Sequence, residues 1–127
     1  MEGKMSPHRN KKGFTLIEVL IAMFLLVVAL LGMASVTVMV IKGNSFSKTM
    51  TTATTLAKDK MEQLKNTSYG SLSSGGPETI QSIYRREWTV PDPDYSPPPN
   101  MKTIKVTVIW NWQNVDHYVT LRTIVAQ

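Results

Sequence analysis

The 127-residue chain contains no cysteine and only two histidines. The absence of cysteine excludes disulfide bonds, cysteine-ligated metal sites and a cysteine nucleophile. His8 lies in a basic N-terminal segment and His117 in a segment that reads as a strand, so we expect both rings to be solvated. No His-x-x-His pair, glycine-rich phosphate loop or Ser-His-Asp set is evident. We therefore expect no catalytic residue, no metal ligand and no cofactor, and the chain does not read as an enzyme.

The residue types alone leave two binding functions possible. Asp92, Asp94 and Asp116 carry oxygens of the kind that bind calcium, but their spacing is not that of an EF-hand. A second group combines cations with an indole, as stacking on single-stranded DNA requires. Its members are Arg85, Arg86, Trp88, Lys102, Lys105 and Arg122. The net charge is +5, of which residues 1–13 supply +3, so we expect a solvated cationic face rather than a nucleic-acid site.

A single long apolar stretch, residues 14–41, follows the basic N-terminal segment. As a helix it would be about 42 Å long at about 1.5 Å per residue, which exceeds a hydrocarbon core of about 30 Å. The preceding cations predict a cytoplasmic N-terminus and an exported C-terminal part. A secretory signal peptide has its small-residue cleavage site after the apolar stretch, whereas Gly13 lies before it. We therefore expect a leader at residues 1–13, a membrane-spanning half-helix at 14–41 and an exported domain at 42–127.

The apolar stretch contains one charged residue, Glu18, close to its start. A carboxylate at the centre of a bilayer costs roughly 2.5–3.5 kcal/mol, so an ionisable residue in such a segment is a functional candidate. Cleavage between Gly13 and Phe14 would create an amine four residues before Glu18, which is the spacing of neighbours on a helix. Pairing the two charges would make burial of the carboxylate tolerable.

The segment Gly13-Phe14-Thr15-Leu16-Ile17-Glu18, with the apolar stretch behind it, resembles the N-terminal signal of type IV pilins and pseudopilins. The resemblance implies cleavage between Gly13 and Phe14 by a prepilin peptidase and N-methylation of Phe14. It also implies that Glu18 attracts the N-terminus of a neighbouring subunit in a helical fibre. The implied partners are this peptidase, other major and minor pilins and an inner-membrane assembly platform. The implied location is a single pass through the inner membrane, with a periplasmic domain that later joins a cell-surface pilus.

Apolar residues beyond the stretch recur every three or four positions, which predicts one helix of about 50 residues ending near Asn66. Alternating β-branched and aromatic residues predict three strands, at 80–90, 102–112 and 118–125, the last two forming a hairpin. We expect a loop at 71–77, which contains Gly75-Gly76-Pro77, and an exposed, mobile loop at 91–100, which contains five prolines. The predicted fold is α+β and pilin-like, with a three-stranded antiparallel sheet packed on the second half of the long helix.

Within the pilin family, the helix end at 56–65 and the segments 86–90 and 106–110 look like PilV-type minor pilins. This resemblance implies a minor pilin that initiates or modifies a type IV pilus. A minor pseudopilin of a type II secretion system is the first alternative, which gene neighbourhood or recovery from surface fibres would separate. The second alternative is an uncleaved, signal-anchored periplasmic binding protein, which failure to process at Gly13 would favour.

Overall fold

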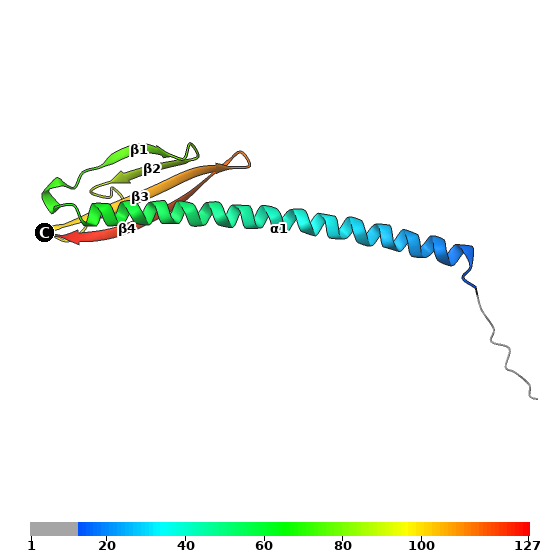
Figure 1. Cartoon of the computed structure of the whole chain (residues 1–127). Coiled ribbons are helices and arrows are strands. Elements are labelled where there is room, and N and C mark those ends of the chain that lie inside the picture. The colour runs from blue at the N-terminus through cyan, green and yellow to red at the C-terminus, as the bar shows by residue number, and fades with distance from the viewer. Residues whose placement is uncertain (1–12) are drawn as a thin grey trace, which may run out of the picture. The chain divides into compact units, whose positions relative to one another are not determined.

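The computed structural model describes residues 13–127. The expected leader, apart from Gly13, lies outside the described residues, and so does His8, which was expected to be solvated. The chain divides into two units between Ile41 and Lys42, and each unit is described separately below (Figure 1).

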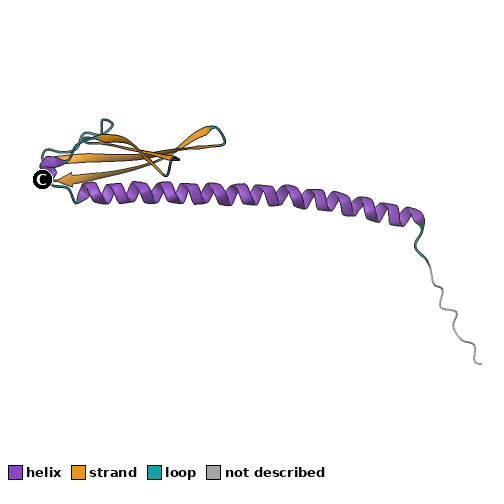
Figure 2. Cartoon of the chain, turned by 45° about the horizontal axis from the view of Figure 1, so that its top comes forward, coloured by secondary structure: helices purple, strands orange, loops and turns teal. Residues whose placement is uncertain are grey.

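One continuous helix, α1, extends from Leu16 to Lys65 (Figures 1 and 2). This confirms the predicted helix of about 50 residues. No proline occurs between Phe14 and Asn66, so no backbone donor is missing from the helical ladder. Seven of its nine hydroxyl side chains are satisfied within the helix, because each of the seven donates to the carbonyl four residues earlier. These are Ser35, Thr37, Thr49, Thr51, Thr52, Thr54 and Thr55.

The second unit contains a four-stranded antiparallel sheet with the strand order β1-β2-β3-β4. Its strands are β1 Gly75–Ile80, β2 Tyr84–Thr89, β3 Met101–Trp112 and β4 Val115–Ala126. The α+β prediction is confirmed, but the predicted number of strands, three, was wrong. The predicted hairpin of β3 and β4 is present, and its turn is shorter than expected. Gln113 and Asn114 both have positive φ, 51° and 63°, as a two-residue hairpin turn requires.

The missed strand is β1, whose glycines read as a loop signal in the sequence. Gly75 is paired with Trp88, and a Cβ atom at Gly75 would lie 2.5 Å from Cζ2 of that indole. Gly76 has φ +95°, and its Cβ would meet the carbonyl oxygen of Arg86 at 2.8 Å. These glycines therefore allow two strands to approach closely, and the turn follows at Gln81–Ser82, both with positive φ. The segment predicted as a strand from residue 80 accordingly begins its β2 pairing at Tyr84.

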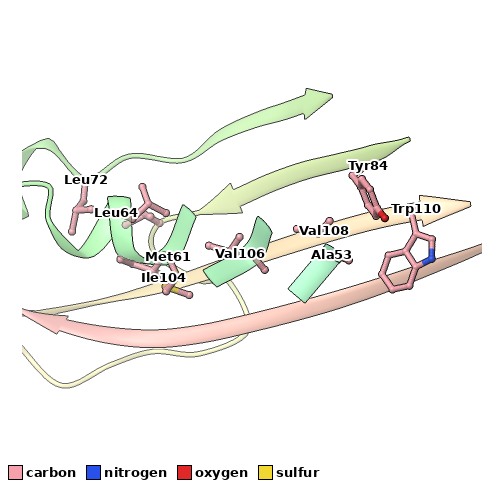
Figure 3. Packing of buried hydrophobic residues seen from close by; sticks show 11 residues of the cluster. Ala53, Met61, Leu64, Leu72, Tyr84, Ile104, Val106, Val108 and Trp110 are labelled. Atoms are coloured by element: carbon pink, nitrogen blue, oxygen red, sulfur yellow. The ribbon is translucent and has the colours of Figure 1, made fainter. Parts of the chain in front are cut away.

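The core forms where one face of α1 meets β3. The helix contributes Ala53 and Ala57, neither with any exposed surface, which let the backbone of α1 lie close to the sheet. The alternating side chains Ile104, Val106 and Val108 of β3 are also fully buried (Figure 3). Around this centre lie Met61, Leu64, Leu72, Tyr84, Val90 and Trp110. The predicted packing of the sheet on the second half of the helix is thus confirmed.

The proline-rich segment 91–100 was predicted to be exposed, and for Asp92 this prediction was wrong. Asp92 is only 3% exposed. Its backbone N–H donates to the carbonyl (3.1 Å) and the hydroxyl (3.0 Å) of Thr103. Its carboxylate accepts a hydrogen bond from Nε of Arg122 at 2.7 Å, and Asp94 accepts from Nζ of Lys105 at 2.6 Å. The start of the segment is therefore held by charge pairs against the sheet face opposite the core.

Candidate processing and assembly site

The described chain begins with an irregular segment that leads directly into α1. Thr15 precedes the first helical residue, and its carbonyl accepts the N–H groups of Glu18 (3.1 Å) and Val19 (3.2 Å). The Thr15 hydroxyl also accepts the N–H of Glu18 at 3.3 Å. Thr15 is therefore the N-cap, and Glu18 is the third residue of the helix. Thr15 was predicted only as part of the motif, although its Thr-x-x-Glu spacing is the signature of a capping box.

The peptide bond between Gly13 and Phe14 lies outside the helix, between two exposed residues. Both residues are exposed, and Phe14 is 83% exposed. A Cβ atom at Gly13 would meet no heavy atom within 4 Å among the described residues. Packing within residues 13–127 therefore does not require glycine there. A requirement for glycine would have to come from a molecule that approaches this bond.

Glu18 lies in the first turn of α1 and is exposed. A carboxylate at this position interacts favourably with the positive end of the helix dipole. Within the described part of the chain, no cation lies within ion-pair distance of Glu18. The nitrogen of Phe14 is an uncharged amide while residue 13 is attached. Cleavage before Phe14 would create a cation close to Glu18 in the sequence, and a second chain could supply another.

The helix behind this site is apolar on every side. No residue from Gly13 to Ile41 is buried, and large side chains such as Leu16 (79%) and Met39 (76%) are mostly exposed. Within the described residues, α1 is the one helix long and apolar enough to cross a bilayer. A helix that is apolar all round belongs in a lipid or protein environment. The first half of α1 therefore fits a single-pass membrane anchor.

Comparison with protein families matches residues 8–34 to the family described as "Prokaryotic N-terminal methylation motif". The chain carries this methylation motif. The match covers 27 of the 127 residues, from the basic segment through Gly13 and most of the apolar stretch to residue 34. The methylation motif supports a type IV pilin-like chain and indicates the precursor of a pilin or pseudopilin. No curated protein and no solved structure matches the chain.

The acidic residues considered as calcium ligands are engaged in other contacts. The carboxylates of Asp92 and Asp94 accept hydrogen bonds from Arg122, and Asp116 accepts one from Nδ2 of Asn111 at 2.8 Å. The hydrogen bond from Lys105 holds the pKa of Asp94 below its usual value. No group of three metal-ligating side chains occurs in residues 13–127.

The cations considered for nucleic-acid binding are mostly paired with protein groups. Arg86 is only 11% exposed and forms a 2.7 Å ion pair with Glu78, whose pKa is lowered by that hydrogen bond. Lys102 donates to the carbonyl of Tyr69 at 2.8 Å. The ring of Trp88 is covered by Lys60, whose Nζ lies 3.7 Å from the ring centroid. These side chains are therefore engaged in separate intramolecular contacts.

His117 was expected to be solvated, but its ring is half-buried. It packs edge-on against Phe46, with 5.1 Å between centroids, and stacks on Trp110 at 5.8 Å.

Proposed function

We propose that this chain is the precursor of a minor pilin. A prepilin peptidase would cut it between Gly13 and Phe14 and methylate Phe14, and the mature chain would enter a type IV pilus through α1. The observation that carries the proposal is the methylation motif, in register with the start of an apolar helix. The exposed Gly13 and Phe14 support it, as does Glu18, which forms no ion pair within residues 13–127. The role is structural rather than catalytic.

Cleavage changes the electrostatics of the helix start. Removing residues 1–13 would convert the amide nitrogen of Phe14 into an ammonium group, and methylation of that amine keeps its charge. Phe14 lies before the first helical residue, Leu16, so pairing with Glu18 within one chain would require the helix to extend back to Phe14, which would make the two residues neighbours four apart. The same carboxylate can instead attract the N-terminus of an adjacent subunit. Either pairing compensates a charge that is costly to leave alone in an apolar environment.

The proposed location follows from the basic leader and the apolar half-helix. Residues 1–13 would remain cytoplasmic, residues 14–41 would cross the inner membrane and residues 42–127 would fold in the periplasm. After processing, the assembly platform would transfer the chain into a fibre with other pilins. The finer assignment to a PilV-type minor pilin is supported by the resemblance of the helix end at 56–65 and of the segments 86–90 and 106–110. The alternatives remain a minor pseudopilin of a type II secretion system and an uncleaved, signal-anchored binding protein.

The test is mass spectrometry of N-terminal peptides from sheared surface fibres and, in parallel, from membranes. We expect a peptide that begins with methylated Phe14 in the fibre fraction. Processed chain in membranes alone would favour the secretion pseudopilin. An intact N-terminus beginning near Met1 in both fractions would overturn the proposal and favour the signal-anchored protein.

A matched variant, Gly13→Val, tests the cleavage position. Because a side chain at this position meets no described atom within 4 Å, the variant should fold and insert normally. We expect it to keep its leader and to be absent from fibres.

A further inference from the structure

The sheet of the second unit has two edge strands, β1 and β4, and they differ in how well they are protected from pairing with another strand. β1 has six residues, contains Pro77, which has no N–H to donate, and shifts its register between Gly75 and Glu78. Short length, proline and an irregular register all discourage pairing at an edge. β4 has twelve residues, contains no proline and pairs with β3 without a register shift. The edge formed by β4 is therefore long and regular.

The hydrogen bonds between β3 and β4 show which backbone groups point away from the sheet. In an antiparallel pair, residues that exchange two hydrogen bonds with the partner strand alternate with residues whose groups point away from it. The N–H of Gln127 donates to the carbonyl of Asn100 at 3.0 Å, and these two residues continue the register of the β3–β4 pair. The odd-numbered residues of β4 therefore bond to β3. The even-numbered residues direct their N–H and C=O groups to the open edge, and they are Asp116, Tyr118, Thr120, Arg122, Ile124 and Ala126.

These outward groups have no backbone hydrogen-bond partner among residues 13–127. The proline-rich segment 91–100 reaches β4 through side chains, because Asp92 and Asp94 accept hydrogen bonds from Arg122. Within the described part of the chain, this segment forms no backbone hydrogen bond to residues 115–126. A row of unpaired N–H and C=O groups is a template for an added strand, whose main-chain hydrogen bonds would supply affinity.

The side chains of β4 indicate what an added strand would carry. On the face toward α1, Val119, Leu121 and Val125 are half-buried and pack against the core. Apolar side chains on an added strand would cover their remaining surface. On the opposite face, Asp116 is exposed and forms no ion pair within residues 13–127. The ring of Tyr118, two residues later on that face, is 72% exposed. A carboxylate near an exposed aromatic ring suits a basic side chain.

A cavity of about 250 Å³ lies toward the other end of the same strand. It is lined by three residues of β4 and three residues near them: Arg122, Thr123, Ile124, Asp92, Tyr95 and Thr103. The charges of Asp92 and Arg122 are already paired with each other. Ile124 and Tyr95 keep 46% and 50% of their surface exposed. The cavity therefore suits an apolar side chain, and such pockets give specificity to an added strand.

We propose that β4 binds an extended segment of another protein, which joins the sheet as an antiparallel strand. Antiparallel pairing is the more stable arrangement. The segment would present apolar side chains at alternate positions to the row of Val119 and Leu121. It would also place an apolar side chain opposite Ile124 and a basic one eight residues later, opposite Asp116. The inference concerns the second unit alone and does not depend on the membrane anchor or on the proposed pilus.

Amide hydrogen exchange tests the inference, followed by NMR on the isotope-labelled full-length chain in detergent micelles. In the free chain, the N–H groups of Tyr118, Thr120 and Arg122 should exchange fast with solvent. The N–H groups of Val119 and Leu121 bond to β3 and should exchange slowly. Slow exchange at the even-numbered amides of the free chain would show that the edge is already covered, by this chain or by a second copy, and would overturn the inference.

The probe is the peptide Leu-Val-Thr-Val-Thr-Val-Thr-Val-Lys, designed with its leucine opposite Ile124 and its lysine opposite Asp116. The control peptide has the same side chains but is N-methylated at its threonines, whose N–H groups would face β4. At a free probe concentration of about ten times its Kd, exchange at the even-numbered amides should slow about tenfold. The odd-numbered amides should not change, and the control peptide should protect none. No protection by the probe, or protection without this alternation, would overturn the inference.

A matched pair of variants tests the edge from the side of the chain. Tyr118→Pro removes one outward N–H at a position where an edge strand tolerates proline, whereas Tyr118→Ala keeps the N–H and removes the ring. We expect Tyr118→Pro to weaken binding of the probe by about tenfold or more and Tyr118→Ala to weaken it less. Slow exchange at Val119 and Leu121 would verify that the proline variant folds. Equal losses would assign binding to the ring rather than to the edge and overturn the inference. The N-methylated peptide makes the same test without changing the chain.

Discussion

The guanidinium of Arg86 donates a hydrogen bond of 3.0 Å to the backbone carbonyl of Leu56, 30 residues earlier in the chain. The same guanidinium forms a 2.7 Å ion pair with Glu78 of β1. One side chain of β2 thus connects the helix, its own strand and the edge strand. The Arg86 side chain is only 11% exposed, whereas the Glu78 side chain is 46% exposed, so water competes less for the hydrogen bond to Leu56 than for the bonds to Glu78.

Replacing this connection should weaken the second unit. Arg86→Met keeps the aliphatic stem but removes every donor, so we expect a loss of about 1.5–3 kcal/mol in the free energy of unfolding. Arg86→Lys retains the charge but not the planar fork, and its loss should be intermediate. Both can be measured by denaturant unfolding of the full chain in detergent, followed by near-ultraviolet circular dichroism. A change within about 0.5 kcal/mol for Arg86→Met, typical of a neutral surface substitution, would show that the connection is not stabilising.

Gly75 is required by the indole of Trp88 rather than by a turn. Gly75→Ala places a methyl group 2.5 Å from Cζ2 of Trp88, so the ring must move away from Lys60 and from the carbonyl of Ser73, to which it donates at 3.2 Å. We expect a loss of about 1–3 kcal/mol in the free energy of unfolding, as for other overpacked sites, with a changed Trp88 emission spectrum. Gly70→Ala is the control, because a Cβ atom there meets nothing within 4 Å. Equal effects of the two substitutions would contradict this explanation.

The ion pair of Asp92 and Arg122 is unequal, since the Asp92 side chain has no exposed surface and the Arg122 side chain is 54% exposed. Arg122→Met would leave a buried carboxylate without its cation, which we expect to cost about 3 kcal/mol. Asp92→Asn would leave the guanidinium in water and should cost only about 1 kcal/mol. A double-mutant cycle on unfolding free energies measures the difference. The reverse order of the two losses would show that Asp92 is not effectively desolvated.

Acid should destabilise the second unit through two carboxylates. Hydrogen bonds from Arg86 and from Lys105 hold the pKa values of Glu78 and Asp94 below their ordinary values, which are about 4.3 and 3.9. The unfolded chain therefore binds protons at higher pH than the folded chain, and stability rises with pH in this range. The contribution is complete above about pH 5 and is lost as the pH falls through the depressed folded values. Melting temperatures between pH 7 and pH 3 should show this fall, and the Glu78→Gln/Asp94→Asn double variant should show a flatter one.

The two roles available to Glu18, capping the helix and pairing with an amine, can be separated by substitution. Glu18→Gln keeps a side chain that a capping box accepts but removes the charge. Thr15→Ala keeps the charge but removes the hydroxyl that accepts the Glu18 N–H, at about 1 kcal/mol of helix stability. If charge pairing drives assembly, Glu18→Gln should insert in the membrane yet fail to enter fibres, whereas Thr15→Ala should assemble. Immunoblots of membrane and sheared-fibre fractions measure both steps, and the opposite pattern would make capping the main role of Glu18.

Local patterns in the sequence were sufficient to predict α1, β3 and β4. Helical spacing and strand alternation depend on residues a few positions apart, so these elements were predicted correctly. The Gly13–Glu18 motif is also local, since its members lie within two turns of chain. Cleavage at Gly13–Phe14 and the assembly role of Glu18 nevertheless remain predictions for the experiments above.

Strand β1 and the burial of Asp92 depended on tertiary contacts. In the sequence Gly75 indicates a loop, whereas in the structure it lies against Trp88, 13 residues later. In the sequence Asp92 belongs to a proline-rich segment predicted to be exposed, whereas in the structure Arg122, 30 residues later, supplies a cation. The sequence alone determined the long apolar helix and the motif, because both depend on neighbouring residues. Only the tertiary structure decided which glycines, carboxylates and aromatic rings meet, because those contacts join residues whose separation along the chain carries no periodic signal.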